Sequence, residues 1–237
     1  MGRIIVTRPE GQQHELMAEL QAAELPVVHV PLLSIYPQPV PPLATDKADI
    51  FIFISPNAAT FAYQQLSTEQ WQTLNDKTLI AVGSATQTKL TALQLNNISI
   101  PNHANSEGLL AMKLLQHVQN KRIILVCGVG GRQLLQQQLS ERGAEVTRYE
   151  VYQRNPITPE LLVSYQQTLE SNDHWLLTSQ DAIDALCQVP WAQAPRAIVS
   201  SQRLKDYAED KGIHIDAVST SALSSDLIQC VVRMSRQ

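Results

Sequence analysis

Small, hydroxylated and basic residues follow most of the short apolar runs in the sequence. They are Thr7 and Arg8, residues 55–57, residues 83–86, residues 128–132, Thr178 and Ser179, and Ser200 and Ser201. If the apolar runs are parallel strands, these residues lie beyond the carboxyl ends of the strands, where α/β sheets bind their ligands. Backbone N–H groups and hydroxyls at such turns can hold an anion. The pattern therefore predicts a site for a small anionic ligand.

The same turns also have explanations that need no ligand. Ser55 and Ser179 can be helix N-caps, and Thr86 falls in the first turn of a predicted helix. Residues 127–132 are either a tight strand-to-helix turn that needs positive φ or a backbone nest for a carboxylate. Tyr152, near the end of a strand, can serve packing or chemistry. The residues alone leave each of these alternatives open.

Charge and the remaining motifs limit the chemistry. A formal net charge of −4 argues against a nucleic-acid-binding surface, although it does not exclude a small anionic ligand. His14 and Glu15 begin like a zincin helix, but Ala18 stands where the second histidine belongs. Residues 128–132 do not complete a GxGxxG fingerprint, no Walker lysine follows them, and no GxSxG elbow occurs. Metal and acyl-transfer chemistry are therefore unsupported, and no phosphate fingerprint is complete.

The cysteines and the hydropathy indicate a location. Cys127, Cys187 and Cys230 are odd in number and widely spaced, which fits neither a disulfide framework nor a zinc site. No apolar run approaches the roughly 18 residues that span a bilayer, and residues 1–8 read as a strand rather than a signal peptide. We expect a protein of the reducing cytoplasm.

An internal duplication covers almost the whole chain of 237 residues. Residues 3–6 recur, with one conservative change, 119 positions later as residues 122–125. The same offset places Leu16 on Leu135, Leu20 on Leu139, Val27 on Val146 and Pro37 on Pro156. With small slips, residues 52–58 match 176–182 and residues 80–84 match 197–201. Two similar domains follow.

The elements predict the fold class. Each copy begins as a buried strand, a polar turn and an amphipathic helix, followed by a second strand that ends before a proline. Short, apolar strands separated by helices are typical of parallel sheets covered by helices on both faces. We therefore expect an α/β protein with two similar domains, each a parallel sheet flanked by helices.

Six motifs, in order along the chain, carry a resemblance to a known family. They are Val6-Thr7-Arg8-Pro9, Ser55-Pro56-Asn57-Ala58, Val82-Gly83-Ser84-Ala85-Thr86, Gly130-Gly131-Arg132, Arg142-Gly143-Ala144-Glu145-Val146 and Val151-Tyr152-Gln153-Arg154. The ordered set resembles the uroporphyrinogen-III synthase family. Residues 199–204 resemble the serine-containing form of some proteobacterial members and depart from the Gly-Pro-Thr turn of others. A role for a threonine in that turn is therefore not transferred.

The resemblance implies a domain organisation. Residues 1–32 and 157–237 would form domain 1, and residues 33–156 would form domain 2. A two-strand linker would join the domains, with the substrate cleft between them. Prolines 31, 37, 39, 41 and 42 bracket the first crossing of this linker, and prolines 156 and 159 bracket the second.

The resemblance also implies a reaction that needs neither a cofactor nor a metal. The family closes hydroxymethylbilane with loss of water and inversion of ring D through a spiro intermediate, in haem and sirohaem biosynthesis. Tyr152 matches the tyrosine proposed to assist departure of the hydroxyl. The expected substrate contacts are Arg8, Ser55, Asn57, Gly83, Thr86, Gly130, Gly131, Arg132, Thr178, Ser179, Ser200 and Ser201.

The implied partner is a small-molecule substrate, with no nucleic acid and no membrane. A monomer is expected, and a transient contact with the preceding enzyme of the pathway stays open. The main alternative is a non-enzymatic two-domain protein that binds a small polyanion, because the same turns would bind the same groups. A nucleotide-dependent enzyme is a weaker alternative, since no phosphate fingerprint is complete.

Overall fold

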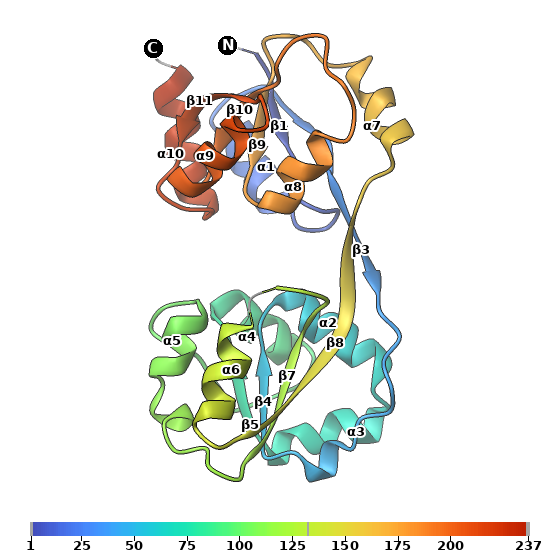
Figure 1. Ribbon diagram of the computed structural model, residues 1–237, viewed down its shortest axis with the longest axis vertical. Coiled ribbons are helices and arrows are strands. Elements are labelled where there is room, and N and C mark those ends of the chain that lie inside the picture. The colour runs from blue at the N-terminus through green and yellow to red at the C-terminus, as the bar shows by residue number, and fades with distance from the viewer. Residues whose placement is uncertain (1, 132, 236–237) are drawn as a thin grey trace. The chain divides into compact units, whose positions relative to one another are not determined.

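The computed structural model describes residues 2–131 and 133–235 (Figure 1). The chain divides into two compact units, which are Met1–Ile35 with Asn155–Gln237 (unit 1) and Tyr36–Arg154 (unit 2). The units meet at 35/36 and 154/155, whereas the sequence predicts domain boundaries at 32/33 and 156/157. In the described part of the chain, no helix is long and apolar enough to cross a membrane.

Unit 1 is built on a five-stranded sheet of order β11-β10-β9-β1-β2. Its strands are β1 (Ile4–Val6), β2 (Val27–His29), β9 (His174–Leu177), β10 (Arg196–Val199) and β11 (His214–Val218). Its helices are α1 (His14–Ala22), α7 (Pro159–Gln166), α8 (Gln180–Leu186), α9 (Gln202–Glu209) and α10 (Ser224–Ser235). All four strand pairings are parallel.

Unit 2 is built on a six-stranded sheet of order β3-β8-β7-β4-β5-β6. The strands are β3 (Leu33–Pro37), β4 (Ile50–Phe53), β5 (Thr78–Ala81), β6 (Ile98–Ser99), β7 (Arg122–Gly128) and β8 (Glu145–Pro156). The helices are α2 (Pro56–Gln65), α3 (Thr68–Thr73), α4 (Ser84–Ala92), α5 (Ser106–Ala111) and α6 (Leu134–Glu141), with short 3-10 turns η1 (Thr45–Lys47), η2 (Leu74–Asp76) and η3 (Lys113–Leu115). The pairings of β4 with β5 and β7, of β5 with β6 and of β7 with β8 are parallel.

The two sheets repeat one topology. The order β2-β1-β9-β10-β11 in unit 1 corresponds to β8-β7-β4-β5-β6 in unit 2, and β3 adds a further edge strand. The register repeats as well, because Ile4 pairs with Val27 while Ile123 pairs with Val146, each 119 positions later. The predicted fold class is confirmed.

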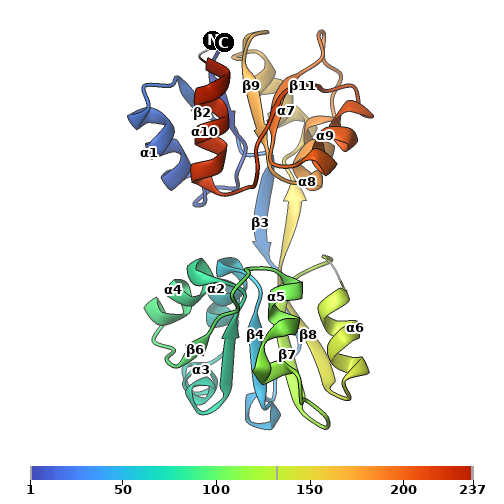
Figure 2. The same ribbon diagram turned by 90° about the vertical axis from the view of Figure 1, so that its left-hand side faces the viewer.

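Alternating side chains of the strands fill two layers of core in unit 1. Ile5, Trp175 and Leu177 face the buried side chains of α7, α8 and α9. Ile4, Val6 and Leu176 face α1 and α10 instead. Successive strand residues point to opposite faces, so each short apolar strand serves both layers. Figure 2 shows α1 and α10 beside each other in unit 1.

The strand residues of unit 2 also point alternately to the two faces of their sheet. Ile50 and Ile52 of β4 pack with buried residues of α5 and α6, whereas Phe53 meets the Trp71 ring of α3 edge-on at a centroid distance of 6.1 Å. Helices α2 and α4 pack together, and so do α5 and α6. The helices after β4 and after β7 therefore leave towards opposite faces. The gap between these two strands is the topological switch point at which open α/β sheets bind ligands.

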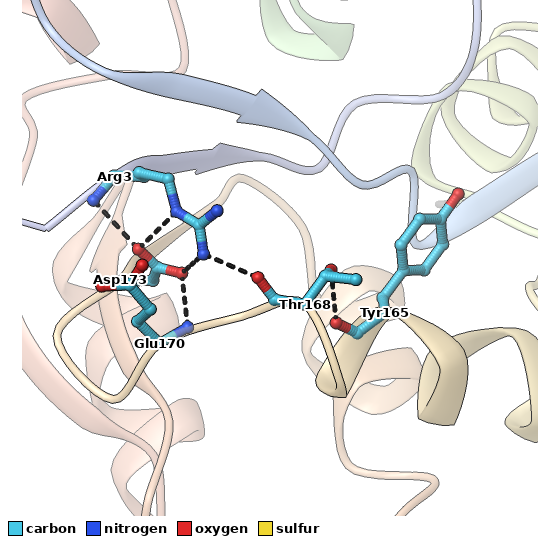
Figure 3. Close-up of polar contacts among 5 residues, drawn as sticks. All are labelled: Arg3, Tyr165, Thr168, Glu170 and Asp173. Atoms are coloured by element: carbon cyan, nitrogen blue, oxygen red, sulfur yellow. Dashed lines mark hydrogen bonds and ion pairs between the residues drawn. The ribbon is translucent and has the colours of Figure 1, made fainter.

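In each unit a carboxylate links the amino ends of two neighbouring strands, β1 and β9 in unit 1 and β4 and β7 in unit 2. In unit 1 the backbone N–H of Arg3 donates to Asp173 Oδ1 at 3.0 Å, and its guanidinium donates to both oxygens, at 3.1 and 2.6 Å (Figure 3). In unit 2 the N–H of Arg122 donates to Asp49 Oδ2 at 2.8 Å. The Asp173 side chain is 2% exposed and that of Asp49 is 37% exposed. This aspartate–arginine contact between two strands, called the clamp below, is therefore buried in unit 1 and exposed to solvent in unit 2.

Candidate functional site

The switch point of unit 2 places Ser55 directly after strand β4. The Ser55 backbone is extended (φ −165°, ψ 160°), and its Oγ accepts the N–H of Ala58 at 3.0 Å as the N-cap of α2. Pro56 at the first helical position has its φ already set for the helix. The sequence Ser-Pro-Asn therefore starts a helix here for local reasons, and the N-cap interpretation of Ser55 is confirmed.

Tyr152 lies at the same edge, on β8 next to β7. The register slips between Cys127 and Gly128, so that Gly128 pairs with Tyr152. The N–H of Val129 donates to the Tyr152 carbonyl at 2.8 Å. A Cβ on Gly128 would lie 2.7 Å from the Cε2 and Cζ atoms of the Tyr152 ring. A glycine is needed at position 128 because the phenol ring occupies the space of a side chain.

The phenol oxygen of Tyr152 has two polar neighbours. Ser55 Oγ is 3.1 Å from Tyr152 Oη, and Nη2 of Arg154 donates to the same oxygen at 3.2 Å. The Arg154 guanidinium carbon lies 5.7 Å from the centre of the ring, and Phe61 stacks on the ring at a centroid distance of 5.7 Å. Tyr152 is 1% exposed. The hydroxyl is thus held in a low-dielectric setting, where hydrogen bonds are stronger than in water.

The glycine turn after β7 adopts the conformation that its sequence predicts. Gly130 and Gly131 have φ of 77° and 78°, and both are exposed. The guanidinium of Arg148 donates to the carbonyls of Gly128 and Gly130, and it pairs with Glu150 at 2.9 Å. The tight-turn interpretation is confirmed, while the nest for a carboxylate stays a prediction. Arg132 lies outside the described residues.

The remaining candidates of unit 2 surround this edge. Gly83 is extended (φ −174°, ψ −179°) and begins α4, and a Cβ there would lie 2.8 Å from Cβ of Ala104. Close packing therefore explains this glycine without a ligand. Thr86 is 2% exposed in the first turn of α4, and Asn57 is half-buried in the first turn of α2.

The corresponding edge of unit 1 carries the other candidates. Ser179 and Ser201 cap α8 and α9 by accepting the N–H groups of Ala182 and Leu204 at 3.2 and 3.3 Å. Thr178 is half-buried between β9 and Ser179, and Ser200 is buried at the end of β10. The structure gives these four residues the turn positions that the sequence predicts.

Arg8 is engaged within its own unit. Its guanidinium donates to Ser224 Oγ at 3.2 Å and to the carbonyl of Ala222 at 2.9 Å, ahead of α10. Burial lowers the pKa of Arg8, and the carboxylates of Glu15 and Glu19 act in the opposite direction. These bonds give Arg8 a structural task, which leaves its role as a substrate contact a prediction.

Cys127, near the end of β7, is poorly suited to act as a nucleophile. Cys127 is fully buried, and burial raises the pKa of its thiol to about 11, with Arg148 lowering it and Glu150 raising it further. Its thiolate, the nucleophilic form, is therefore scarce at neutral pH. Across residues 2–131 and 133–235, no three His, Cys, Asp or Glu side chains are grouped as metal ligands.

Sequence reasoning missed three residues of this site. Arg154 and Phe61 contact the Tyr152 ring or its hydroxyl, and Arg148 supports the glycine turn. The sequence could have indicated Arg154, because it follows Tyr152 by two positions on one strand and such residues share one face of the sheet. No comparable sequence signal marks Phe61, whose place beside Tyr152 depends on how α2 packs on the sheet.

Comparisons with known proteins agree with one another. The family model described as uroporphyrinogen-III synthase HemD matches residues 14–229. The uroporphyrinogen-III synthase of Escherichia coli K12 is 30% identical over 252 residues, which cover 96% of this chain and 99% of that protein. The Proteus mirabilis uroporphyrinogen-III synthase is 34% identical over 160 residues, which cover 64% and 79%.

Solved structures support the fold. The uroporphyrinogen-III synthetase of Helicobacter pylori aligns over 100% of both chains with a TM-score of 0.73 at 14% identity. A mutant uroporphyrinogen III synthase of Thermus thermophilus aligns over 100% of this chain and 99% of that one, with a TM-score of 0.63 at 16% identity. The family match decides for an enzyme over the non-enzymatic binding protein, and the chain belongs to the uroporphyrinogen-III synthase family.

Proposed function

We propose that this chain closes hydroxymethylbilane to uroporphyrinogen III at the switch point of unit 2, with Tyr152 as the hydrogen-bond donor to the departing hydroxyl. The observation that carries the proposal is the placement of the Tyr152 phenol. Its oxygen lies 3.1 Å from Ser55 Oγ and 3.2 Å from Arg154 Nη2, at the edge where open α/β sheets bind their ligands. Family membership supplies the reaction, which is of the lyase class in tetrapyrrole biosynthesis.

The reaction depends more on how the substrate is positioned than on a strong acid or base. The hydroxyl leaves ring A as an azafulvene forms, and ring D attacks through its substituted carbon to give a spiro-pyrrolenine. This intermediate fragments and recloses with ring D inverted, and water is the other product. Holding the substituted carbon against the methylene raises its effective concentration. A donor aimed at the leaving oxygen stabilises the negative charge that develops there.

The acetate and propionate groups of the substrate need anion contacts. We assign them to Asn57, Gly83, Thr86, Gly130, Gly131 and Arg132 in unit 2 and to Arg8, Thr178, Ser179, Ser200 and Ser201 in unit 1. Helix starts and glycine turns offer backbone N–H groups, and helix dipoles favour negative charge at their amino ends. Seven of these candidates lie in the turns that begin α2, α4, α8 and α9. Ser55 also belongs to this edge, although its hydroxyl already faces the phenol.

Access to Tyr152 requires a local movement. The ring is covered by Phe61 and by the backbone of Gly128. Beyond Gly128 the turn is open, since nothing lies within 4 Å of a Cβ built on Gly130 or Gly131. Displacement of this turn by the substrate would bring the departing hydroxyl to Tyr152 Oη at little packing cost.

A monomer in the cytoplasm completes the proposal. Cys127, Cys187 and Cys230 are all free, as expected where thiols stay reduced. Light scattering of the pure protein at working concentration should give the mass of one 26.3 kDa chain. A stable dimer would contradict the monomer, and a co-purifying preceding enzyme would reveal the transient contact.

The activity itself is tested by product analysis. Purified, chelator-treated protein is incubated with enzymatically generated hydroxymethylbilane, and the uroporphyrin isomers are separated after oxidation. The type III isomer should dominate. If only the type I isomer forms, at the uncatalysed rate, the protein binds polyanions without catalysing closure.

A further inference from the structure

We infer that Ser55 and Arg154 are positioning residues that act through Tyr152, by filling the acceptor side of its phenol oxygen so that the O–H is left for the departing hydroxyl. The inference rests on the proposed role of Tyr152 and assigns Ser55 a task other than holding a carboxylate. It follows from the hydrogen-bond capacities of three side chains.

Arg154 fixes the first part of the arrangement. A guanidinium has donors and no acceptor. At 3.2 Å from Tyr152 Oη, Nη2 of Arg154 therefore donates to the phenol oxygen, and the phenol cannot donate back. Arg154 thus occupies one acceptor position of that oxygen.

Ser55 fixes the second part. Its Oγ accepts the N–H of Ala58 at 3.0 Å, so N-capping of α2 uses a lone pair and leaves the hydroxyl hydrogen unassigned. Tyr152 Oη lies 3.1 Å away. Two arrangements satisfy this contact, in which either Tyr152 donates to Ser55 or Ser55 donates to Tyr152.

Arrival of the leaving hydroxyl selects the second arrangement. If Ser55 donates, Tyr152 Oη accepts from both Ser55 and Arg154, and its own O–H is released for a third partner. The exchange needs only rotation of two hydroxyl hydrogens. Donors to one oxygen polarise its O–H bond and strengthen its outgoing hydrogen bond. The pair thereby makes a buried phenol a better donor at the moment when negative charge develops.

The test separates action through Tyr152 from direct contact with substrate. Ser55→Ala should lower kcat about fivefold, the worth of one neutral hydrogen bond, and leave KM within about twofold. In the Tyr152→Phe background the same change should alter kcat less than about twofold, because the hydroxyl on which Ser55 acts is gone. A raised KM with unchanged kcat, or an equal loss in both backgrounds, would overturn the inference.

Arg154 is tested in the same cycle. Arg154→Met removes the charge and the donor while keeping a long apolar stem, and kcat should fall about tenfold. In the Tyr152→Phe background the loss should shrink to about twofold. If the full tenfold loss persists there, Arg154 acts on the substrate rather than through the phenol.

Two further variants control for folding. Ser67 caps α3 in the same unit by accepting the N–H of Gln70 at 3.1 Å, and its own N–H donates to Gln70 Oε1 at 3.0 Å. Ser67→Ala should lower the melting temperature about as much as Ser55→Ala and leave kcat unchanged. Ser55→Thr keeps a capping hydroxyl and should restore kcat to within about twofold of the wild type. Failure of that rescue, with the protein folded, counts against the inference.

The proposed function and this inference can fail separately. Absence of the type III isomer from the wild-type reaction would remove the function. A wild type that makes the type III isomer, together with additive losses in the cycle, would remove the inference alone.

Discussion

The two units repeat one scaffold and differ at the position where chemistry is expected. Strand order and register coincide, and the offset of 119 residues places Leu33 on Tyr152 of unit 2. Leu33 is the first residue of β3, which begins within unit 1 before it joins the sheet of unit 2. Leu33 is buried in the apolar core with Ile157 and Leu162, whereas the hydroxyl of Tyr152 meets Ser55 and Arg154. Equivalent positions of the repeat therefore belong to an apolar core in one copy and to a polar cluster in the other.

The serine turns show the same divergence. Ser55 and Ser179 both cap the helix that follows the equivalent strand, with bonds of 3.0 and 3.2 Å. Of these two serines, only Ser55 forms a hydrogen bond to a phenol among the described residues, namely to Tyr152 Oη at 3.1 Å. The cap is a requirement of the fold, so both copies retain it, and function depends on what is added around it. The residues to test are thus those by which the copies differ.

Leu33→Ala should have the largest effect on stability. Removing a buried leucine leaves a cavity and costs about 2–5 kcal/mol. Because Leu33 packs in a core and carries no polar group, the kcat of the folded fraction should stay within about twofold. Chemical denaturation and kinetics at a temperature where the variant is folded provide the measurement. A hundredfold loss of kcat with stability intact would contradict the assignment of Leu33 to packing.

The clamps at the amino ends of the strands should differ in strength. Asp173→Ala removes a buried carboxylate with four hydrogen bonds, and we expect a loss of about 2–3 kcal/mol in the free energy of unfolding. Asp49→Ala removes an exposed one, and less than about 1 kcal/mol should be lost. Equal losses in denaturant melts would show that burial does not distinguish the two clamps.

The pH dependence gives the same clamp a second test. Burial raises the pKa of Asp173, but hydrogen bonds from the Arg3 side chain and from the N–H groups of Glu170 and Arg3 outweigh it, so the pKa is lowered overall. A lowered folded-state pKa means that the contribution is present above the ordinary aspartate range near 3.9 and is lost as pH falls through the folded-state value. Asp173→Ala should therefore show a smaller loss of stability on acidification than the wild type.

Single anion contacts should have the smallest effects. Thr86→Ala in unit 2 and Ser179→Ala in unit 1 each remove one hydroxyl among many candidate contacts, so about 1 kcal/mol should be lost, mainly as a higher KM. Steady-state kinetics with hydroxymethylbilane would measure it. If either variant lost kcat instead, its hydroxyl would act at the reacting centre.

Much of the scaffold could be predicted from the sequence, because local rules decide it. The repeat, the alternating strands and the capping serines are all short-range signals, and the two-layer α/β architecture follows from them. The division of the first copy into β2 and β3 was not foreseen, whereas β8 runs unbroken from Glu145 to Pro156. Pro31, which cannot donate a ladder hydrogen bond, falls in that break.

The polar cluster was only partly predictable. Tyr152 and Ser55 were both candidates, but their contact spans 97 residues and depends on β4, β7 and β8 being neighbours. The need for glycine at position 128 arises from the tyrosine ring opposite it, which no local pattern records. Arg8 was assigned to substrate, yet its bonds to residues 222 and 224 depend on a fold partner more than 200 residues away.

On the mechanism that we propose, the hydroxyl of Tyr152, and not the scaffold alone, assists departure of the leaving group. Tyr152→Phe removes that donor and keeps the ring that packs on Phe61. Removing one neutral donor aimed at developing charge costs about 2.7–4 kcal/mol. The kcat for formation of uroporphyrinogen III should therefore fall about 100- to 1,000-fold, far more than for Thr86→Ala or Ser179→Ala, in a protein that still folds. Near-full turnover of this variant would show that the hydroxyl leaves without help from Tyr152, and conformational control would then be the source of catalysis.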